Sequence, residues 1–389
     1  MITMINTFTN EIDDTEAAVQ EILEQIKSAK PLSTHSIGIV TCFADFISSG
    51  VLAALAAALP FPIVGITTLA SATRGHHGEM TLVMSILTGA DVEFVPACTK
   101  PLAGEEEAPI KEAWEAATKG RGDMPELILS FAPLLLNAAA DFYAEVWTEI
   151  APNVPTFGTL AVDHNLDYHE SATILNGEAF KDRYVFVLCY GNVKAQFFVA
   201  GITEEKAFRE KGVVTSSVGN QVKGVNGVSV AQYLKGLGLK EDENGIIEGI
   251  NSFPFIMDYH DGAQQPVIRC MFAITPDGSA VCGGKVPEGA TLSVGVINVD
   301  EVLTTSGLML QKAKEAAAGG KAVLMFSCVG RFFAQGFNQT AEMEKAQSIW
   351  SGLPFHLAYS GGELCPVYDK TGLGTTNRCH NATLVICVF

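Results

Sequence analysis

One pattern of strands, turns and helices occurs three times along the chain. Each copy reads as a strand rich in β-branched or aromatic residues, a turn, an amphipathic helix, a second strand that leads into a loop, and a closing strand. The copies begin at IGIVTCFADF, ELILSFAPLL and KAVLMFSCVGRF. Copies one and three agree in detail, since Leu59-Pro60-Phe61 matches Leu353-Pro354-Phe355 and residues 77–83 match residues 380–385. The repeat predicts an α/β fold of mixed sheets covered by helices and built from strand–helix–strand–strand units, with a layered sandwich as one possible arrangement.

A different region separates the second and third copies. Asn226-Gly227 is a strong hairpin signal between alternating apolar residues, and Asp261-Gly262 is a further turn signal. The charged, glycine-containing stretch KEDENG, residues 240–245, is the best candidate for a domain boundary. We therefore predict an amino-terminal domain of residues 1–242 and a carboxy-terminal domain of residues 243–389.

The composition fits a large protein with an extensive apolar core. Of the 389 residues, 48% are hydrophobic and 17% are charged, which argues against extended disorder. The net charge of −18 would repel phosphate backbones and anionic lipid, so we expect neither nucleic acid nor a membrane as a partner. The apolar stretch from Val51 to Gly65 is interrupted by Pro60 and Pro62 and is too short to span a bilayer.

The cysteines and the amino terminus predict a cytoplasmic protein. The nine cysteines form no close C-x-x-C pair, and several lie within apolar runs, as expected of buried thiols in a reducing compartment. The amino-terminal residues through Lys27 are acidic and amphipathic, and they lack the basic and then apolar layout of a signal peptide.

Three separated motifs resemble the carboxy-terminal module of the FIST family. They are FSCVGR at 326–331, SGGEL at 360–364 and CHNATLVI at 379–386, in the order that the family shows. Farther upstream, VVTSSVGNQVKGVNG and VPEGATLSVG also resemble family segments. The amino-terminal half resembles the partner FIST module, with IVGITTLAS in place of the family's GCST-x-GE loop. This loop lacks the usual cysteine and glutamate, so it gives no support to a function lodged there.

The resemblance covers nearly the whole chain, with residues 1–242 as a FIST amino-terminal-like domain and 243–389 as a FIST carboxy-terminal-like domain. It implies a stand-alone sensory protein that binds a small ligand, an amino acid or a similar small polar metabolite. FIST modules are often fused to output domains, but this sequence contains neither a G-x-x-x-x-G-K-[ST] loop nor a kinase glycine-rich loop. We therefore expect a receptor rather than an enzyme, without a cofactor, that signals through a separate downstream protein.

Two charged residues form the centre of the expected ligand site. Arg331 follows a predicted strand, at the edge of an open α/β sheet where ligands bind. Its guanidinium would hold a carboxylate by two parallel hydrogen bonds, while Glu363 would hold an ammonium group. A zwitterionic amino acid fits such a pair. The alternative is an Arg–Glu pair that joins two loops with no ligand between them.

Five more residues complete the expected cleft, which three segments would form beside the final strand. They are Cys328, Tyr359, Ser360, His380 and Asn381. Phe332, Phe333 and Tyr359 are available as apolar walls, since ligand pockets combine such walls with a few convergent polar groups.

Two other functions remain open at this stage. A cysteine-dependent enzyme would use Cys328 as nucleophile with His380 as base, although no third orienting group is evident. A non-catalytic scaffold for partner proteins is the other alternative. We expect no metal site, because Cys328, Cys365, Cys379 and His380 follow no recognised zinc spacing.

A second cluster of possible metal ligands lies in the loop after the central strand of the second copy. It contains Asp163, His164, Asp167 and His169. These types of side chain can bind a divalent cation, but such clusters are more often solvated loop residues, which is the interpretation we favour.

Overall fold

The computed structural model describes residues 2–135, 137–165, 167–243, 247–317, 322–372 and 374–389. It confirms an α/β fold with mixed sheets, built from the three predicted copies. In each copy the first strand runs parallel to the second and antiparallel to the closing strand. These strands are β2 (His35–Cys42), β3 (Ile63–Thr67) and β6 (Leu82–Gly89); β8 (Leu127–Ala132), β9 (Thr156–Leu160) and β12 (Val185–Gly191); and β22 (Val323–Cys328), β23 (His356–Ser360) and β26 (Leu384–Val388).

Each copy also sends a hairpin into the sheet of another copy. The β4–β5 hairpin of the first copy pairs with β23 of the third, β10–β11 of the second pairs with β3 of the first, and β24–β25 of the third pairs with β9 of the second. The bounds are Ser71–Thr73 and His76–Gly78, Thr173–Leu175 and Glu178–Phe180, and Glu363–Tyr368 and Thr375–His380. The exchange closes a ring in which each of the three six-stranded sheets contains strands of two copies.

An edge strand from just upstream of each copy completes each six-stranded sheet. These strands are β1 (Thr3–Thr9) beside β6, β7 (Val92–Cys98) beside β12, and β13 (Gln196–Ala200) beside β26. The three sheets share one apolar core, to which each contributes inward-facing residues such as Ile39, Phe157 and Phe326. Three sheets therefore face a common core.

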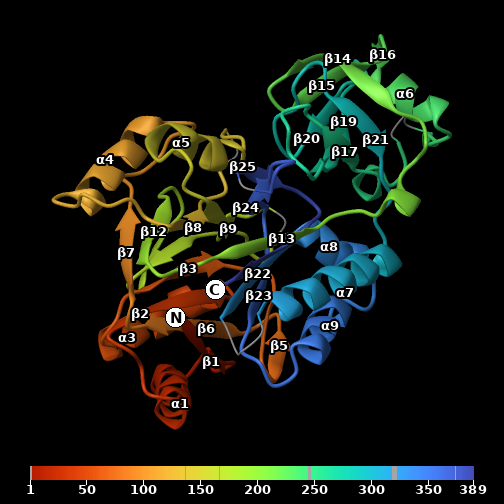
Figure 1. Cartoon of the computed structure of the whole chain (residues 1–389). Coiled ribbons are helices and arrows are strands. Elements are labelled where there is room, and N and C mark those ends of the chain that lie inside the picture. The colour runs from red at the N-terminus through yellow and green to blue at the C-terminus, as the bar shows by residue number, and fades with distance from the viewer. Residues whose placement is uncertain (1, 136, 166, 244–246, 318–321, 373) are drawn as a thin grey trace.

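Helices cover the outer face of each sheet, on three sides of the core in Figure 1. Alternation along the strands explains this arrangement, since Phe326 faces the shared core while its neighbour Met325 packs under the helices of its own copy. The helices are α1 (Thr15–Ser28), α2 (Asp45–Ser48) and α3 (Val51–Ala58); α4 (Glu107–Thr118) and α5 (Phe142–Ile150); and α7 (Val299–Ala316), α8 (Val329–Ala334) and α9 (Ala341–Ile349). Within the described ranges, the helices are too short or too polar to cross a membrane.

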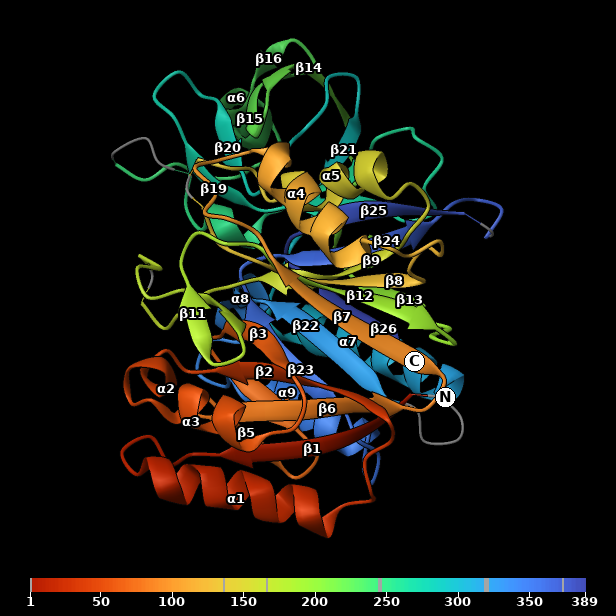
Figure 2. The same ribbon diagram turned by 90° about the vertical axis from the view of Figure 1, so that its left-hand side faces the viewer.

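An insertion lies between β13 and α7, ahead of the first strand of the third copy, and we call it the inserted domain (residues 212–294). It stands at the upper right of Figure 1 and at the top of Figure 2, and has an apolar core of its own. Its elements are β14 (Gly212–Val218), β15 (Gln221–Val225), β16 (Val228–Ser229), α6 (Val230–Gly236), β17 (Phe255–Asp258), β18 (Val267–Arg269), β19 (Met271–Ile274), β20 (Ala280–Cys282) and β21 (Thr291–Val294).

Local signals within the inserted domain agree with its structure. Asn226 and Gly227 both have positive φ, of 53° and 80°, as the predicted tight hairpin between β15 and β16 requires. The domain division between residues 242 and 243 stays a prediction. Residues 244–246, part of which belongs to the proposed boundary, lie outside the described residues.

The turn that follows β2 in the first copy meets the loop that follows β9 in the second. The rings of Phe43 and His164 pack together there at a tilt of 32°, with centroids 4.3 Å apart. The corresponding turn of the third copy, after β22, lies beside the inserted domain instead.

Close packing of the parallel strands requires glycine at one position in two of the copies. A Cβ at Gly65 would lie 1.7 Å from the carbonyl oxygen of Val40, and a Cβ at Gly158 would lie 1.8 Å from that of Ser130. We expect Gly65→Ala to lower the free energy of unfolding by about 3 kcal/mol or more, because the neighbouring backbone cannot move aside.

Urea denaturation measures this effect, and Gly78→Ala is the matched control. An added Cβ at Gly78 meets nothing within 4 Å, so this second variant should unfold like the wild type. Equal unfolding midpoints for the two variants would contradict the strand spacing described above.

Candidate functional site

A cavity of about 700 Å³ lies between the inserted domain and the end of the core where β22 and β23 finish. Cys328, Gly330 and Phe333 line it from the start of α8, and Asn381 lines it from the end of β25. The loop after β8 contributes Leu134, Leu135 and Ala138 to Ala140. The inserted domain contributes the opposite wall, with Asn220, Cys270, Phe272, Cys282, Gly283 and Gly284.

The described lining of this cavity carries no charged side chain. Its walls are mainly apolar, with the thiols of Cys270, Cys282 and Cys328 and a few amides and hydroxyls. Phe272 and Phe333 are 61% and 47% exposed and so mark the opening of the cavity to solvent. Apolar walls with few polar groups are typical of sites for small organic molecules.

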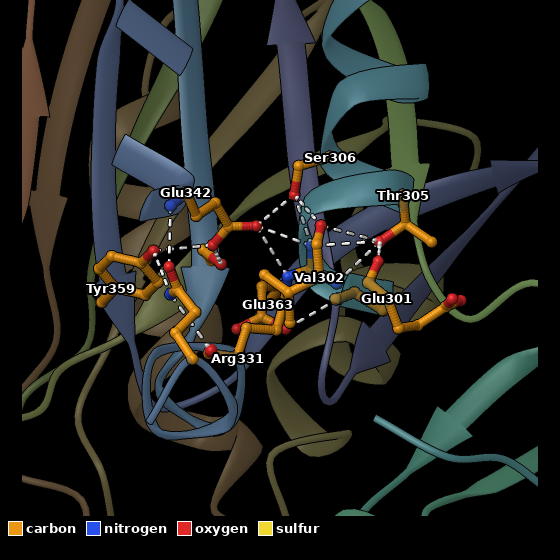
Figure 3. A network of polar contacts seen from close by, with 11 residues as sticks. Glu301, Val302, Thr305, Ser306, Arg331, Glu342, Tyr359 and Glu363 are labelled. Atoms are coloured by element: carbon orange, nitrogen blue, oxygen red, sulfur yellow. Dashed lines mark hydrogen bonds and ion pairs between the residues drawn. The ribbon is translucent and has the colours of Figure 1, made fainter. Parts of the chain in front are cut away.

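Arg331 lies one helical turn into α8 but points away from the cavity into the protein. Its side chain is fully buried, and its Nη2 donates hydrogen bonds to Glu342 Oε1 (2.7 Å), Ser306 Oγ (2.6 Å) and the carbonyl oxygen of Val302 (3.0 Å). Figure 3 shows this cluster, which joins α8 to α7 and α9. Arg331 therefore holds α8 in place.

Glu342 is the carboxylate at the centre of the cluster. Its Oε2 accepts hydrogen bonds from Ser327 Oγ (2.7 Å) and from the hydroxyl of Tyr359 (2.8 Å). Burial by itself would raise the pKa of Glu342, but the Arg331 guanidinium and the hydroxyls of Ser306 and Ser327 hold this pKa below its usual range. The hydroxyl of Tyr359 hydrogen-bonds within this cluster, and Tyr359 is not among the residues that line the cavity.

Glu363, the expected partner of Arg331, is buried at the start of β24 and is not among the residues that line the cavity. Its Oε2 accepts a hydrogen bond from Thr383 Oγ1 (2.9 Å), and its Oε1 has no partner among the described residues. Burial raises the pKa of Glu363 well above its usual value. The expected clamp around a zwitterion is therefore not formed, because Arg331 pairs with Glu342 and both expected side chains are closed off from the cavity.

Cys328 and His380 also differ from the arrangement that an enzyme would need. Cys328 lies in the cavity wall with 6% exposure, and burial raises the pKa of its thiol well above its usual value. His380 is fully buried, its Nε2 donates to the carbonyl oxygen of Cys365 (3.1 Å), and burial lowers its pKa to about 3. A thiol that stays protonated and an imidazole that hydrogen-bonds elsewhere do not form a nucleophile–base pair.

The remaining expected site residues have distinct places. Ser360 is buried at the end of β23 and hydrogen-bonds to Thr159 of the second copy. Asn381 lines the cavity and is 4% exposed. Asp163 accepts backbone hydrogen bonds from Asn165 and Glu170 (both 2.7 Å), so its carboxylate stabilises its own loop. Across the described part of the chain, no group of three or more His, Cys, Asp or Glu side chains is arranged to hold a metal ion.

Family models match the chain over two adjacent stretches, the FIST N domain at residues 36–228 and the FIST C domain at residues 229–366. The chain belongs to the FIST family. FIST domains are in general sensory domains that bind small ligands. No curated protein sequence matches this FIST chain.

Solved structures give weaker comparisons. A cyanuric acid hydrolase from A. caulinodans is similar at 10% identity with a TM-score of 0.38, covering 100% of the FIST chain and 99% of the other chain. T. maritima PurL complexed with ATP is similar at 8% identity with a TM-score of 0.19, covering 100% and 71% of the two chains. Both scores are too low to support an argument about function.

A second buried ion pair connects the inserted domain to the core beside the cavity. Arg269 of β18 pairs with Asp141, just before α5, and donates to the carbonyl oxygen of Cys379 (2.8 Å). A Cβ at Gly284 would lie 2.4 Å from Asp141 Oδ2, so glycine is needed where the two parts meet. The sequence analysis did not identify the cavity wall that the inserted domain contributes, because the residues of that wall form no motif. The adjacent glycines 283 and 284 are the one local hint of close backbone approach.

We expect Arg331→Ala to lower the free energy of unfolding by about 3–5 kcal/mol, because it leaves the Glu342 carboxylate buried without a counterion. Urea denaturation measures the change. Lys111→Ala removes an exposed ion pair with Glu107 and should have little effect. If Arg331→Ala unfolds like the wild type, Arg331 does not have the structural role described here.

A pH dependence follows from the buried histidine at position 380. The pKa of His380 is about 3 in the folded protein against an ordinary 6.5, so between these values the unfolded chain binds the extra proton. The stability that the folded protein gains by keeping His380 neutral is complete above pH 6.5 and is lost as the pH falls toward 3. His380→Gln keeps a donor for Cys365 but cannot titrate, so it should remove up to about 1.4 kcal/mol per pH unit of this acid dependence.

Urea denaturation of both proteins at pH 6, 5 and 4 tests this. His356, which is also buried with a pKa of about 3, titrates in both proteins and cancels in the comparison. Parallel pH profiles for wild type and variant would contradict the buried neutral state of His380.

Proposed function

We propose that this FIST chain is a sensory protein that binds a small polar metabolite, an amino acid or a similar molecule, in the cavity between the inserted domain and the core. The observation that carries the proposal is the cavity itself, with its volume of about 700 Å³, mostly apolar walls and few polar groups. Its position beside the three carboxy-terminal motifs agrees with the sensory role of the family.

The two-sided lining supports a signalling role. A ligand would contact Cys328 and Asn381 on the core and Cys270 and Phe272 on the inserted domain, and so would bind best when both walls are correctly spaced. Binding would then stabilise one placement of the inserted domain. We propose that a separate protein recognises this change.

The cellular setting belongs to the same proposal. All nine cysteines lie within the described residues as free thiols, and eight of them are buried. Free thiols in this number are typical of a reducing compartment, which supports a cytoplasmic receptor.

Gly330 offers a direct test, because it lies in the cavity wall within a helix. A Cβ there would make ordinary contacts with the sulfurs of Cys328 and Cys270, at 3.6 and 4.0 Å. Gly330→Leu should place a branched apolar side chain in the cavity and obstruct ligand entry, whereas Gly330→Ala should leave most of the cavity open and suits the helix at least as well.

We expect a thermal-shift screen of amino acids, small organic acids and neutral metabolites to find compounds that raise the melting temperature of the wild type. The shift should persist in Gly330→Ala and disappear in Gly330→Leu. A shift that survives in Gly330→Leu would place binding elsewhere. A screen without any shift, together with recovery of a partner protein by the apo chain, would favour the scaffold alternative.

A further inference from the structure

We infer that the cavity recognises the apolar body of an amphipathic small molecule, such as an amino acid with an aromatic or aliphatic side chain, and leaves the charged head group of that molecule in solvent at the opening. The inference rests on the proposed function, because it concerns the same cavity. It narrows the ligand from small polar metabolites in general to those that carry an apolar side chain.

The buried part of the lining is suited to an apolar group. Leu160 and Ile297 are only 2% and 4% exposed, and the three thiols named above lie in the same lining. Burial raises the pKa of all three thiols, so they are uncharged at neutral pH. An apolar group in contact with these walls leaves water without breaking hydrogen bonds of its own, which is favourable in proportion to the area covered.

A charged ligand group finds no counterion in the described lining. Arg331 and Arg269, whose neighbours in the sequence line the cavity, are already matched by Glu342 and Asp141. A carboxylate or ammonium group that moved in among the apolar walls would give up water without gaining a partner of opposite charge, which is unfavourable. The same group keeps its hydration if it stays at the opening, so the opening is where we place the head group.

The opening itself has aromatic sides. Phe272 of β19 and Phe333 of α8 come from opposite walls and are 61% and 47% exposed. A ring that is half exposed can contact an apolar body on one side and water on the other. The two rings therefore mark the level at which the apolar body of the ligand would end and its hydrated head group would begin.

A first series of probes tests the role of the apolar body by ligand-observed NMR titration, which detects weak binding. It keeps the amino-acid head group and lengthens the side chain by one methylene at a time, from L-alanine through L-2-aminobutyrate and L-norvaline to L-norleucine. We expect each step to tighten binding by about fourfold, because each added methylene leaves water for the apolar walls.

A second series keeps the phenyl body and changes the head group. Its members are L-phenylalanine, D-phenylalanine, phenethylamine and 3-phenylpropionate, and we expect their affinities to agree within about fivefold because the head group stays hydrated. Sodium chloride at about 0.5 M screens the attraction of phenethylamine to the net charge of −18. A first series without any gain, or a second series spread over more than about tenfold, would overturn the inference.

Phe272→Ala and Phe333→Ala connect the preference to the opening. Both side chains are about half exposed, so these variants should fold like the wild type. Each should weaken the binding of L-phenylalanine by about two- to tenfold. Phe337→Ala is the matched control, because Phe337 is fully exposed and is not part of the described lining, and it should bind like the wild type. Unchanged affinity in both cavity variants would also count against the inference.

The outcome separates this inference from the proposed function. If the probes bind the wild type and lose binding in Gly330→Leu, but their affinities follow the head group, the cavity is a ligand site and only the inferred ligand class is wrong. If no probe binds in a way that Gly330→Leu abolishes, and the thermal-shift screen finds no such compound either, the cavity is not the ligand site and both statements are wrong.

Discussion

The exchange of hairpins among the three copies is the constraint on which the rest of the structure depends. Since β10–β11, β24–β25 and β4–β5 each complete the sheet of another copy, no copy can satisfy its strand edges alone. The ring also brings the ends of β22 and β23 next to the loops of the second copy. This is how a cavity can form from residues as far apart in the sequence as Leu134 and Asn381, a separation of more than half the chain.

Buried charges then hold the walls of the cavity in place without entering it. The Arg331–Glu342 pair joins three helices of the third copy, and the Arg269–Asp141 pair joins the inserted domain to the second copy. Each pair has hydroxyl, backbone or carbonyl groups that use its remaining hydrogen-bonding capacity. Polar side chains of the kind that could hold a ligand thus fix the positions of the cavity walls, and the described lining of the cavity itself is left without charged side chains.

The sequence predicted the parts of the fold that have a local signal. The strand and helix periods gave the three copies, and Asn226-Gly227 gave a hairpin, because periodicity and turn chemistry act over a few residues. The sequence did not predict the exchange of hairpins, because the backbone hydrogen-bonding groups at a strand edge are the same for every possible partner strand. The prediction placed Arg331 correctly at a strand end but named the wrong carboxylate as its neighbour. The sequence alone does not distinguish Glu342 from Glu363 as the counterion, because only the folded chain shows which of them lies beside the guanidinium. Asn381 was found because a motif marked it, whereas Cys270 and Cys282 belong to no motif.

The insertion makes the corner after β22 in the third copy unlike the corner after β2 in the first copy. At the corner of the first copy, the rings of Phe43 and His164 pack against one another, whereas the turn after β22 faces the inserted domain. Repetition of the scaffold therefore does not imply repetition of the site. A ligand in this cavity would occupy one position per chain and saturate it hyperbolically, so any sigmoidal response would have to come from association between chains.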